Sequence, residues 1–300
     1  MKKIIVFSLF ILLISMHSCS KDQNEPQIVI QKTIFEHVRS NLDYSYLKDA
    51  LEITDLDDVL NEDGDYTLYA PNNSAFIGFL MRRGYSTLDE VPIEVLKKIL
   101  HNHLMVGQIR YRDFKSGYYQ TAAVSDVNDR PLSIYINQVN MRVTLNGSSR
   151  IVQGNVNSSN GVIHAVNAVV PIPTLVTFVL ADPDLYNLAM ALTRDDLTVD
   201  FLSFLNTESR GARATFTVFA PSNMAFVDLL NELDVDQLSL IDEPTLSLTL
   251  NHHVLDGINV LFSDLSDNLT LSKLGGKITV NVSGGASLTD GNSRVSNIIS

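Results

Sequence analysis

The 300-residue sequence contains a single cysteine, Cys19, and no tryptophan. One cysteine cannot form an intramolecular disulfide, and it excludes a zinc site built from several thiolates. Basic residues are also few, since 22 Lys and Arg stand against 34 Asp and Glu and give a formal net charge of −12. Nucleic-acid affinity comes mainly from Lys and Arg at phosphates, so this charge balance argues against a nucleic-acid partner.

The remaining composition is that of a folded protein. Hydrophobic residues make up 45% of the chain and charged residues 19%, which excludes wholesale disorder. A domain usually holds about 100–150 residues, so a chain of this length is expected to contain two domains, each with its own core.

The first eighteen residues have the pattern of a secretory signal peptide. Lys2 and Lys3 precede a predominantly apolar run from Ile4 to Ile14, and Ser18 stands just before Cys19. The run is shorter than the ~20 residues that a membrane-spanning helix needs, which disfavours an uncleaved anchor. The position of the cysteine resembles a bacterial lipobox, and this resemblance implies that Cys19 is lipidated and becomes the first mature residue. The alternative is a buried structural cysteine.

Residues 19–32 are expected to be the lipidated cysteine and a flexible tether, because Ser20 to Gln27 is polar and lacks apolar periodicity. Lys21-Asp22 followed by Glu25 is similar to the surface-export signal of some outer-membrane lipoproteins. That similarity implies a protein anchored by lipid in the outer membrane and exposed at the cell surface. Two or three acyl chains attach a protein stably, whereas a single chain binds only marginally.

The body of the chain repeats itself at an offset of 150 residues. Thr67–Phe76 (TLYAPNNSAF) recurs as Thr217–Phe226 (TVFAPSNMAF). At the same offset Leu96, Leu100, His103 and Gly107 recur as Leu246, Leu250, His253 and Gly257. A period this long predicts two tandem domains rather than a solenoid. Two prolines near residues 171–173 mark the joint, which gives domains at 33–173 and 174–300.

The second copy ends before it has matched the whole of the first. In the first copy Ser149–Ile151 is followed by Asn160–Val166 (NGVIHAV), whereas the second copy reaches Ser300 soon after its equivalent, Ser293–Val295. Two explanations are open: the sequence is part of a longer chain, which we favour, or the second domain lacks its closing strand. A lost strand would leave an open sheet edge with unpaired backbone groups.

Local signals predict helices around a short strand in each copy. Residues 66–70 are expected to form a buried strand, followed by a helix that Asn72 or Asn73 caps. A second helix is expected to begin at Pro92 and end with Gly107 as its C-terminal cap. Its predicted apolar face consists of Leu96, Ile99, Leu100, His103 and Leu104.

The later part of each copy is expected to be β-structure. Apolar and polar residues alternate on both sides of Asn146-Gly147, which is a strong hairpin signal. Val162–Val166 predicts a further strand, and Ile278, Val280 and Val282 alternate in the second copy. Helices followed by hairpins indicate an α+β fold with a mostly antiparallel sheet.

The combined motifs resemble the fasciclin domain. They are a strand leading into Ala-Pro-x-Asn-x-Ala-Phe, a helix ending in His and Gly, and Asn-Gly-Val-Ile-His further on. The resemblance implies two tandem domains, each a wedge-shaped β-sandwich with packed helices, the second incomplete at its C-terminus. It also implies a surface-attached protein that acts in adhesion and has no catalytic apparatus or cofactor. Animal relatives carry a Tyr-His pair linked to integrin binding, but this chain has Asn102-His103 and His252-His253, so that activity is not transferred.

The histidines are expected to be structural. His103 and His253 lie on the apolar stripe of the helix, and His164 lies in an apolar strand. Buried polar side chains are nearly always hydrogen-bonded, so their ring nitrogens should bind backbone groups. No metal site is expected, because His101 and His103 diverge on a helix and the Asp-rich run at 55–65 lacks the spacing of a calcium loop. No catalytic motif is present either, so we predict that the protein is not an enzyme.

Tyrosines concentrate in the β part of the first copy, and surface tyrosines stack on sugars or anchor protein partners. The possible ligand-contact residues are therefore Tyr111, Tyr118, Tyr119 and Tyr135. The alternative is that they are ordinary strand tyrosines. Together the features predict a non-catalytic, lipid-anchored surface protein that binds an extracellular protein or glycan. The alternative function is an accessory glycan- or protein-binding subunit of an outer-membrane nutrient-uptake complex.

Overall fold

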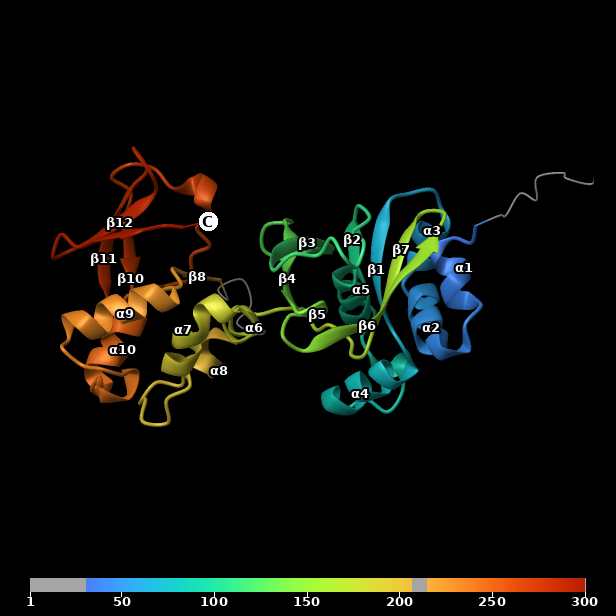
Figure 1. Ribbon diagram of the computed structural model, residues 1–300, viewed down its shortest axis with the longest axis horizontal. Helices are drawn as coiled ribbons and strands as arrows, with labels where there is room; N and C mark the ends of the chain where they lie inside the picture. Colours follow the sequence, from blue (N-terminus) through green and yellow to red (C-terminus); the bar gives the residue numbers. More distant parts are fainter. Residues whose placement is uncertain (1–30, 207–214, 300) are drawn as a thin grey trace, which may run out of the picture. The chain divides into compact units, whose positions relative to one another are not determined.

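The structure, a computed structural model, describes residues 31–206 and 215–299 (Figure 1). Cys19, the predicted signal peptide and almost all of the predicted tether lie outside these residues. Both halves of the described chain have helices first, then a strand followed by two longer helices, and then β-structure. This order confirms the predicted α+β class and its tandem repetition.

Two helices of the first half begin where a side chain accepts from a free backbone N–H group. Thr33 and Glu36 form a reciprocal capping box, in which Thr33 Oγ1 accepts from the Glu36 N–H at 3.1 Å. Asn72 Oδ1 accepts from the Ala75 N–H at 2.9 Å, so Asn72 rather than Asn73 is the cap that the sequence predicted. The helices of the first half are α1 (Ile34–Arg39), α2 (Ser45–Ile53), α3 (Leu56–Asn61), α4 (Asn73–Arg83) and α5 (Ile93–Asn102), with short 3-10 turns at Leu42–Tyr44 and Leu88–Glu90.

The strands of the first half form one sheet in the order β2-β1-β7-β6-β5-β4-β3. Neighbours are antiparallel except β1 and β7, which run parallel with Tyr69 opposite His164. β6 shifts register against β7 between Ile151 and Val156, and such bulges bend a strand. The edge strands β2 and β3 contact each other, so the sheet curls back on itself. The strands are β1 (Tyr66–Pro71), β2 (Leu104–Val106), β3 (Gly117–Val124), β4 (Pro131–Val139), β5 (Arg142–Leu145), β6 (Ser149–Ser158) and β7 (Gly161–Val166).

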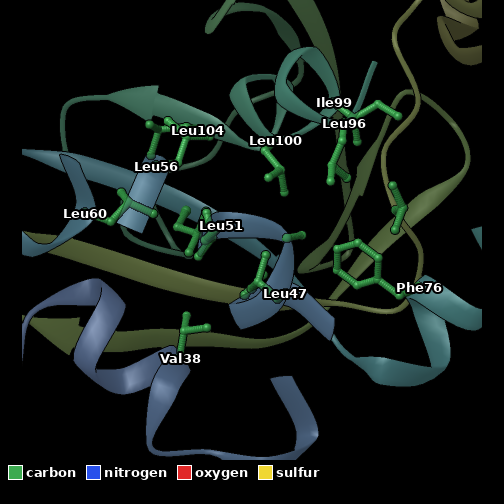
Figure 2. Packing of buried hydrophobic residues seen from close by; sticks show 14 of the residues in the cluster. Val38, Leu47, Leu51, Leu56, Leu60, Phe76, Leu96, Ile99, Leu100 and Leu104 are labelled. Atoms are coloured by element: carbon green, nitrogen blue, oxygen red, sulfur yellow. The ribbon is translucent and has the colours of Figure 1, made fainter. Parts of the chain in front are cut away.

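Two clusters of buried apolar side chains hold the first half together. One lies between the helices and the sheet, where Leu51 of α2, Phe76 of α4 and Leu100 of α5 converge (Figure 2). The other lies inside the curled sheet and includes Tyr69 and Ile134, both fully buried. Burial of one large apolar side chain is worth about 1.5–3 kcal/mol, so these clusters fix the helices against the sheet.

The second half repeats the plan with shorter strands. β8 pairs antiparallel with β9 and sets Thr217 opposite Leu255, which reproduces Thr67 opposite Met105 in β1 and β2. A separate sheet follows in the order β10-β11-β12-β13. The elements are α6 (Leu175–Ala181), α7 (Tyr186–Leu192), α8 (Phe201–Leu205), β8 (Phe216–Val218), α9 (Asn223–Glu232), α10 (Glu243–Asn251), β9 (Val254–Asp256), β10 (Thr270–Lys273), β11 (Gly276–Asn281), β12 (Ser287–Asp290) and β13 (Val295–Asn297), with 3-10 turns at Pro183–Leu185, Leu238–Leu240 and Phe262–Asp264.

The helix predicted between Pro92 and Gly107 is shorter than expected. Pro92 is the N-cap residue rather than the first helical one, α5 ends at Asn102, and His103 is the C-cap residue. Gly107 follows β2 and has a φ of 91° there, so it does not cap the helix. The prediction was wrong because Leu104 in β2 packs into the same cluster as the apolar face of α5. The hydrophobic spacing therefore continues past the end of the helix.

Candidate functional site

His103 joins the end of α5 to the segment after β7. Its Nε2 accepts from the Val170 N–H at 2.9 Å, so the proton is on Nδ1, which donates to Ile99 O at 2.8 Å. The side chain is fully buried, and burial lowers its pKa to about 4 because the cation would lose its hydration. His103 is thus a neutral imidazole near pH 7 with both nitrogens bound to backbone.

His164 makes a second backbone connection from β7. Its Nδ1 accepts from the Asn155 N–H at 3.3 Å, which places the proton on Nε2, and Nε2 donates to Ile109 O at 2.8 Å. The Phe114 ring lies edge-on at 5.3 Å, and burial lowers the pKa of His164. The side chain links β7, β6 and the loop that follows β2.

Asn160 is a structural residue that the sequence reasoning missed. Its Oδ1 accepts from the Ile34 N–H at 2.8 Å. Its Nδ2 donates to Leu60 O at 2.8 Å and to Glu62 O at 2.7 Å. This side chain, only 1% exposed, ties the start of α1 and the end of α3 to the turn before β7. The available signal was its position immediately before Gly161 in the Asn-Gly-Val-Ile-His motif.

Asn73 and Asn223 form a matched pair whose role the sequence reasoning missed, since Asn73 was considered only as a possible helix cap. Asn73 Oδ1 accepts from the Tyr46 N–H at 3.1 Å, and Asn223 Oδ1 accepts from the Asn187 N–H at 2.9 Å. Each asparagine joins the helix after the central strand to an earlier helix of the same half. Their recurrence at the 150-residue offset was the signal for this shared role.

His253 occupies the place of His103 in the second half but makes fewer contacts. Its Nδ1–H donates to Thr249 O at 2.8 Å, as His103 donates to Ile99. Within residues 31–206 and 215–299, no hydrogen-bond partner is recorded for its Nε2. The ring is partly buried, and burial lowers its pKa. Nε2 of His253 is therefore a hydrogen-bond acceptor. The equivalent atom in the first half, Nε2 of His103, accepts from the Val170 N–H.

A cavity of about 190 Å³ lies beside this histidine, and we call it the His253 cleft. Its walls are almost wholly apolar and come mainly from α6, α7, β8 and α10, including Leu175, Phe178, Leu188, Val218, Leu250 and His253. An apolar cleft with one convergent polar atom is the usual form of a binding site.

The strand beside the cleft lacks the neighbour that covers its counterpart. In the part of the chain that the structure describes, β8 is paired with β9 alone, whereas β1 lies between β2 and β7. Leu68 and Ala70 of β1 are 2% and 0% exposed. At the equivalent positions Val218 is partly exposed and Ala220 is exposed.

The four tyrosines do not gather at one place. Tyr111 donates its hydroxyl to Met141 O at 2.6 Å, and Tyr119 donates to Lys115 O at 3.1 Å. Both side chains are partly buried and serve local backbone contacts.

Tyr118 and Tyr135 lie side by side, with ring centroids 4.9 Å apart. Tyr118 is 50% exposed and donates its hydroxyl to Asp182 Oδ2 at 2.8 Å. Burial and this hydrogen bond raise the pKa of Tyr118, and burial raises the pKa of Tyr135 to about 12. Tyr135 is only 5% exposed, so Tyr118 is the member of the pair with an accessible ring. A ligand contact by any of the four tyrosines stays a prediction.

Carboxylates are plentiful, but no ligand set forms among them in the described ranges. No three His, Cys, Asp or Glu side chains of those ranges are placed to hold a metal ion. A shallow acidic depression of about 470 Å³ is lined by Tyr46, Asp49, Glu52, Ile53, Leu88 and Asp89. For residues 31–206 and 215–299, no single helix has the length and apolar character to cross a membrane, although the bent pair Leu175–Ala181 and Pro183–Leu192 (95°) passes the same criteria together.

Comparison with known proteins identifies the family. The fasciclin-domain family model matches residues 42–173 and 183–299, which is more than half of the chain. The protein therefore belongs to the fasciclin-domain family, as the sequence resemblance predicted, and carries two such domains in tandem.

Several relatives share this domain. Human periostin is 31% identical over 171 residues, which are 55% of this chain and 18% of periostin. The pig transforming growth factor-beta-induced protein ig-h3 is 28% identical over 240 residues, 78% of this chain and 31% of the relative. Protein sll1483 of Synechocystis is 28% identical over 138 residues, 46% of this chain and 72% of that protein. A solved FAS1 domain pair from the insect cell adhesion molecule fasciclin I matches at 16% identity with a TM-score of 0.46, covering 84% of this chain and 90% of that one.

Proposed function

We propose that this protein is a non-catalytic adhesion or ligand-binding protein, anchored by lipid in the outer membrane and displayed at the cell surface. The observation that carries the proposal is the match of the fasciclin family to both halves of the chain. Membership of this family supports a surface-attached protein that acts in adhesion, with an extracellular protein or glycan as the partner.

The chemistry of the histidines supports a binding role over a catalytic one. A general base needs a ring nitrogen free to take a proton from a substrate. Both nitrogens of His103 and of His164 bind backbone groups inside the first domain. Burial lowers both pKa values, so neither ring is protonated near pH 7 and neither is a ready proton donor. His103 and His164 therefore stabilise the fold of the first domain by linking backbone segments to one another.

The lipid anchor is tested at Cys19. In cells fed a radiolabelled fatty acid, we expect the wild-type chain to carry label and fractionate with outer membranes. The Cys19→Ala variant should carry no label and leave the membrane fraction, whereas the matched Ser20→Ala variant should behave as wild type. Protease added to intact cells should degrade the wild-type protein if it is displayed outside. An unlabelled wild-type chain would refute the anchor, and protection from protease would refute surface display.

The binding role is tested with the whole protein in lipid vesicles. Vesicles that carry it should attach to cells or to a glycan array, and attachment should saturate and be blocked by free protein. The Tyr118→Ala variant removes an exposed ring, and a fall in attachment would identify the surface around Tyr118 as the contact surface. Attachment no better than that of empty vesicles would refute the adhesion proposal. A transporter that stably co-purifies from native membranes would instead support the alternative, an accessory subunit of a nutrient-uptake complex.

A further inference from the structure

We propose that a basic patch on the first domain binds an acidic polysaccharide through the carboxylates of its sugars. The patch consists of Arg110, Arg112 and Lys115 in the loop between β2 and β3, and of Arg142 at the start of β5. All four residues are exposed. The inference rests on the proposed binding role and deepens it, because it names the chemical class of the ligand and the surface that contacts it.

Hydrogen bonds fix the loop between β2 and β3 against the end of the β4–β5 hairpin. The Tyr111 hydroxyl donates to Met141 O at 2.6 Å. Further along the loop, Ser116 Oγ accepts from the Gln138 N–H near the end of β4 at 2.9 Å. Met141 directly precedes Arg142, so these contacts bring the three cations of the loop to the same end of the sheet as Arg142.

The equivalent loop of the second copy shows that the fold does not require these cations. The two loops begin alike, because Thr67 Oγ1 accepts from the Ile109 N–H at 2.9 Å and Thr217 Oγ1 accepts from the Val260 N–H at 2.8 Å. Residues 107–116 hold three Lys or Arg and one Asp, whereas residues 257–266 hold no Lys or Arg. The same loop is thus built with or without the positive charges, which points to a role for them in binding.

The patch concentrates positive charge on a chain whose formal net charge is −12. Within residues 31–206 and 215–299, none of its four cations is recorded in an ion pair. Like charges held close together repel one another, and an anionic ligand relieves that repulsion. Each arginine also presents paired N–H donors that match the two oxygens of a carboxylate. An anion with several carboxylates along its length therefore fits the patch.

The surroundings of the patch favour a polysaccharide over a nucleic acid. Three amide side chains are exposed along β6, namely those of Gln153, Asn155 and Asn157. Arg110 donates to Asn157 Oδ1, so the cations and the amides share one surface. Amides both donate and accept hydrogen bonds, which suits the hydroxyl groups of sugars. DNA carries one charge per about 1.7 Å and would extend beyond the patch onto an acidic protein, whereas a polysaccharide with at most one carboxylate per sugar is repelled less.

The test measures the binding of a fluorescent oligogalacturonate to the full-length protein in a non-ionic detergent. Fluorescence anisotropy should show saturable binding that weakens as the salt concentration is raised, because salt screens exposed charges. The matched probe is the same oligosaccharide after reduction of its carboxylates to alcohols. It keeps the sugar chain and loses the charge, and it should show no saturable binding.

Paired variants locate the binding surface. Arg112→Gln combined with Arg142→Gln removes two exposed charges of the patch and should weaken oligogalacturonate binding about tenfold. The matched control combines Arg82→Gln with Arg130→Gln, at the end of α4 and in the turn between β3 and β4. It changes the net charge equally and should bind like the wild-type protein. Circular dichroism establishes that both double variants fold.

Three outcomes would overturn the proposal. They are the absence of saturable binding, an equal loss of affinity in the two double variants, and equally tight binding of a DNA fragment or of phosphatidylglycerol vesicles that depends on the same two arginines. The last outcome would assign the patch to a nucleic acid or to a membrane. Adhesion of the protein-bearing vesicles without oligogalacturonate binding would refute the polysaccharide site alone. Oligogalacturonate binding without surface attachment would refute the adhesion proposal alone.

Discussion

Replacing His103 with alanine should destabilise the first domain by about 3–5 kcal/mol. The substitution leaves the Val170 N–H buried without a partner, which alone costs about 1–3 kcal/mol. It also removes the bond to Ile99 O and empties the volume of a fully buried ring, and the cavity adds a cost of similar size. Such a loss is a large fraction of the stability of an ordinary domain.

The equivalent substitution in the second domain, His253→Ala, should reduce the free energy of unfolding much less. His253→Ala removes one recorded hydrogen bond, from Nδ1 to Thr249 O, and the ring is only partly buried. The net worth of such a bond is about 0.5–1.5 kcal/mol. Both substitutions replace a histidine by alanine at equivalent positions of the repeat. The difference between their losses in the free energy of unfolding therefore measures how much the contact of His103 with the segment around Val170 stabilises the first domain.

Hydrogen exchange during urea titration, read by mass spectrometry, follows the two domains separately in one protein. His103→Ala should lower the urea midpoint of peptides from β1 and β7 and leave those from α10 nearly unchanged. Attachment to cells under conditions where the variant is still folded should persist. An unchanged midpoint together with abolished attachment would refute the structural role of His103. Equal losses in the two domains would refute the comparison with His253.

The remaining predictions concern the first domain. Acidification from pH 7 to 4 should reduce the free energy of unfolding of this domain by up to about 3 kcal/mol. The pKa of His103 falls from 6.5 to about 4 on folding, so the unfolded chain binds the proton first as the pH falls. A pH-independent urea midpoint would contradict this. Asn160→Ala should cost about 2–4 kcal/mol in urea unfolding, since it leaves backbone groups of α1 and α3 without partners. Gly161→Ala should prevent normal folding, because a Cβ there would lie 2.3 Å from Tyr66 O. The control Gly291→Ala adds a Cβ in open space and should leave the urea midpoint of unfolding unchanged.

Local signals were sufficient to predict the capped helix after β1. Pro71 and Asn72 act within a few residues of each other, and the cap geometry follows from the Asn72 side chain alone. The repeat and the fasciclin resemblance then supplied the tandem α+β architecture. His103 and His164 could be assigned to the interior, because His103 falls on an apolar helical stripe and His164 in an apolar strand.

Long-range features could not be predicted in the same way. The pattern of Val162–Val166 indicates a strand but does not say which strand it joins, so its parallel pairing with β1, in a sheet that is mostly antiparallel as expected, could not be predicted. Asn160 looks like an exposed turn residue in sequence, whereas folding buries it against two helices. The walls of the His253 cleft come from segments far apart in sequence, including Leu175, Val218 and Leu250, so no local pattern encodes the cleft.

The position of Asn160 also has a consequence for the order in which the first domain is assembled. Its side chain binds the backbone of Ile34, 126 residues earlier in the chain, and β7 follows it directly. Contacts between such distant residues slow folding, because a long loop must close before they form. The domain cannot complete its sheet until nearly all of its residues have left the ribosome. The export that we propose would therefore meet a first domain that stays incompletely folded, and able to thread through a translocation channel, until nearly all of it has been synthesised.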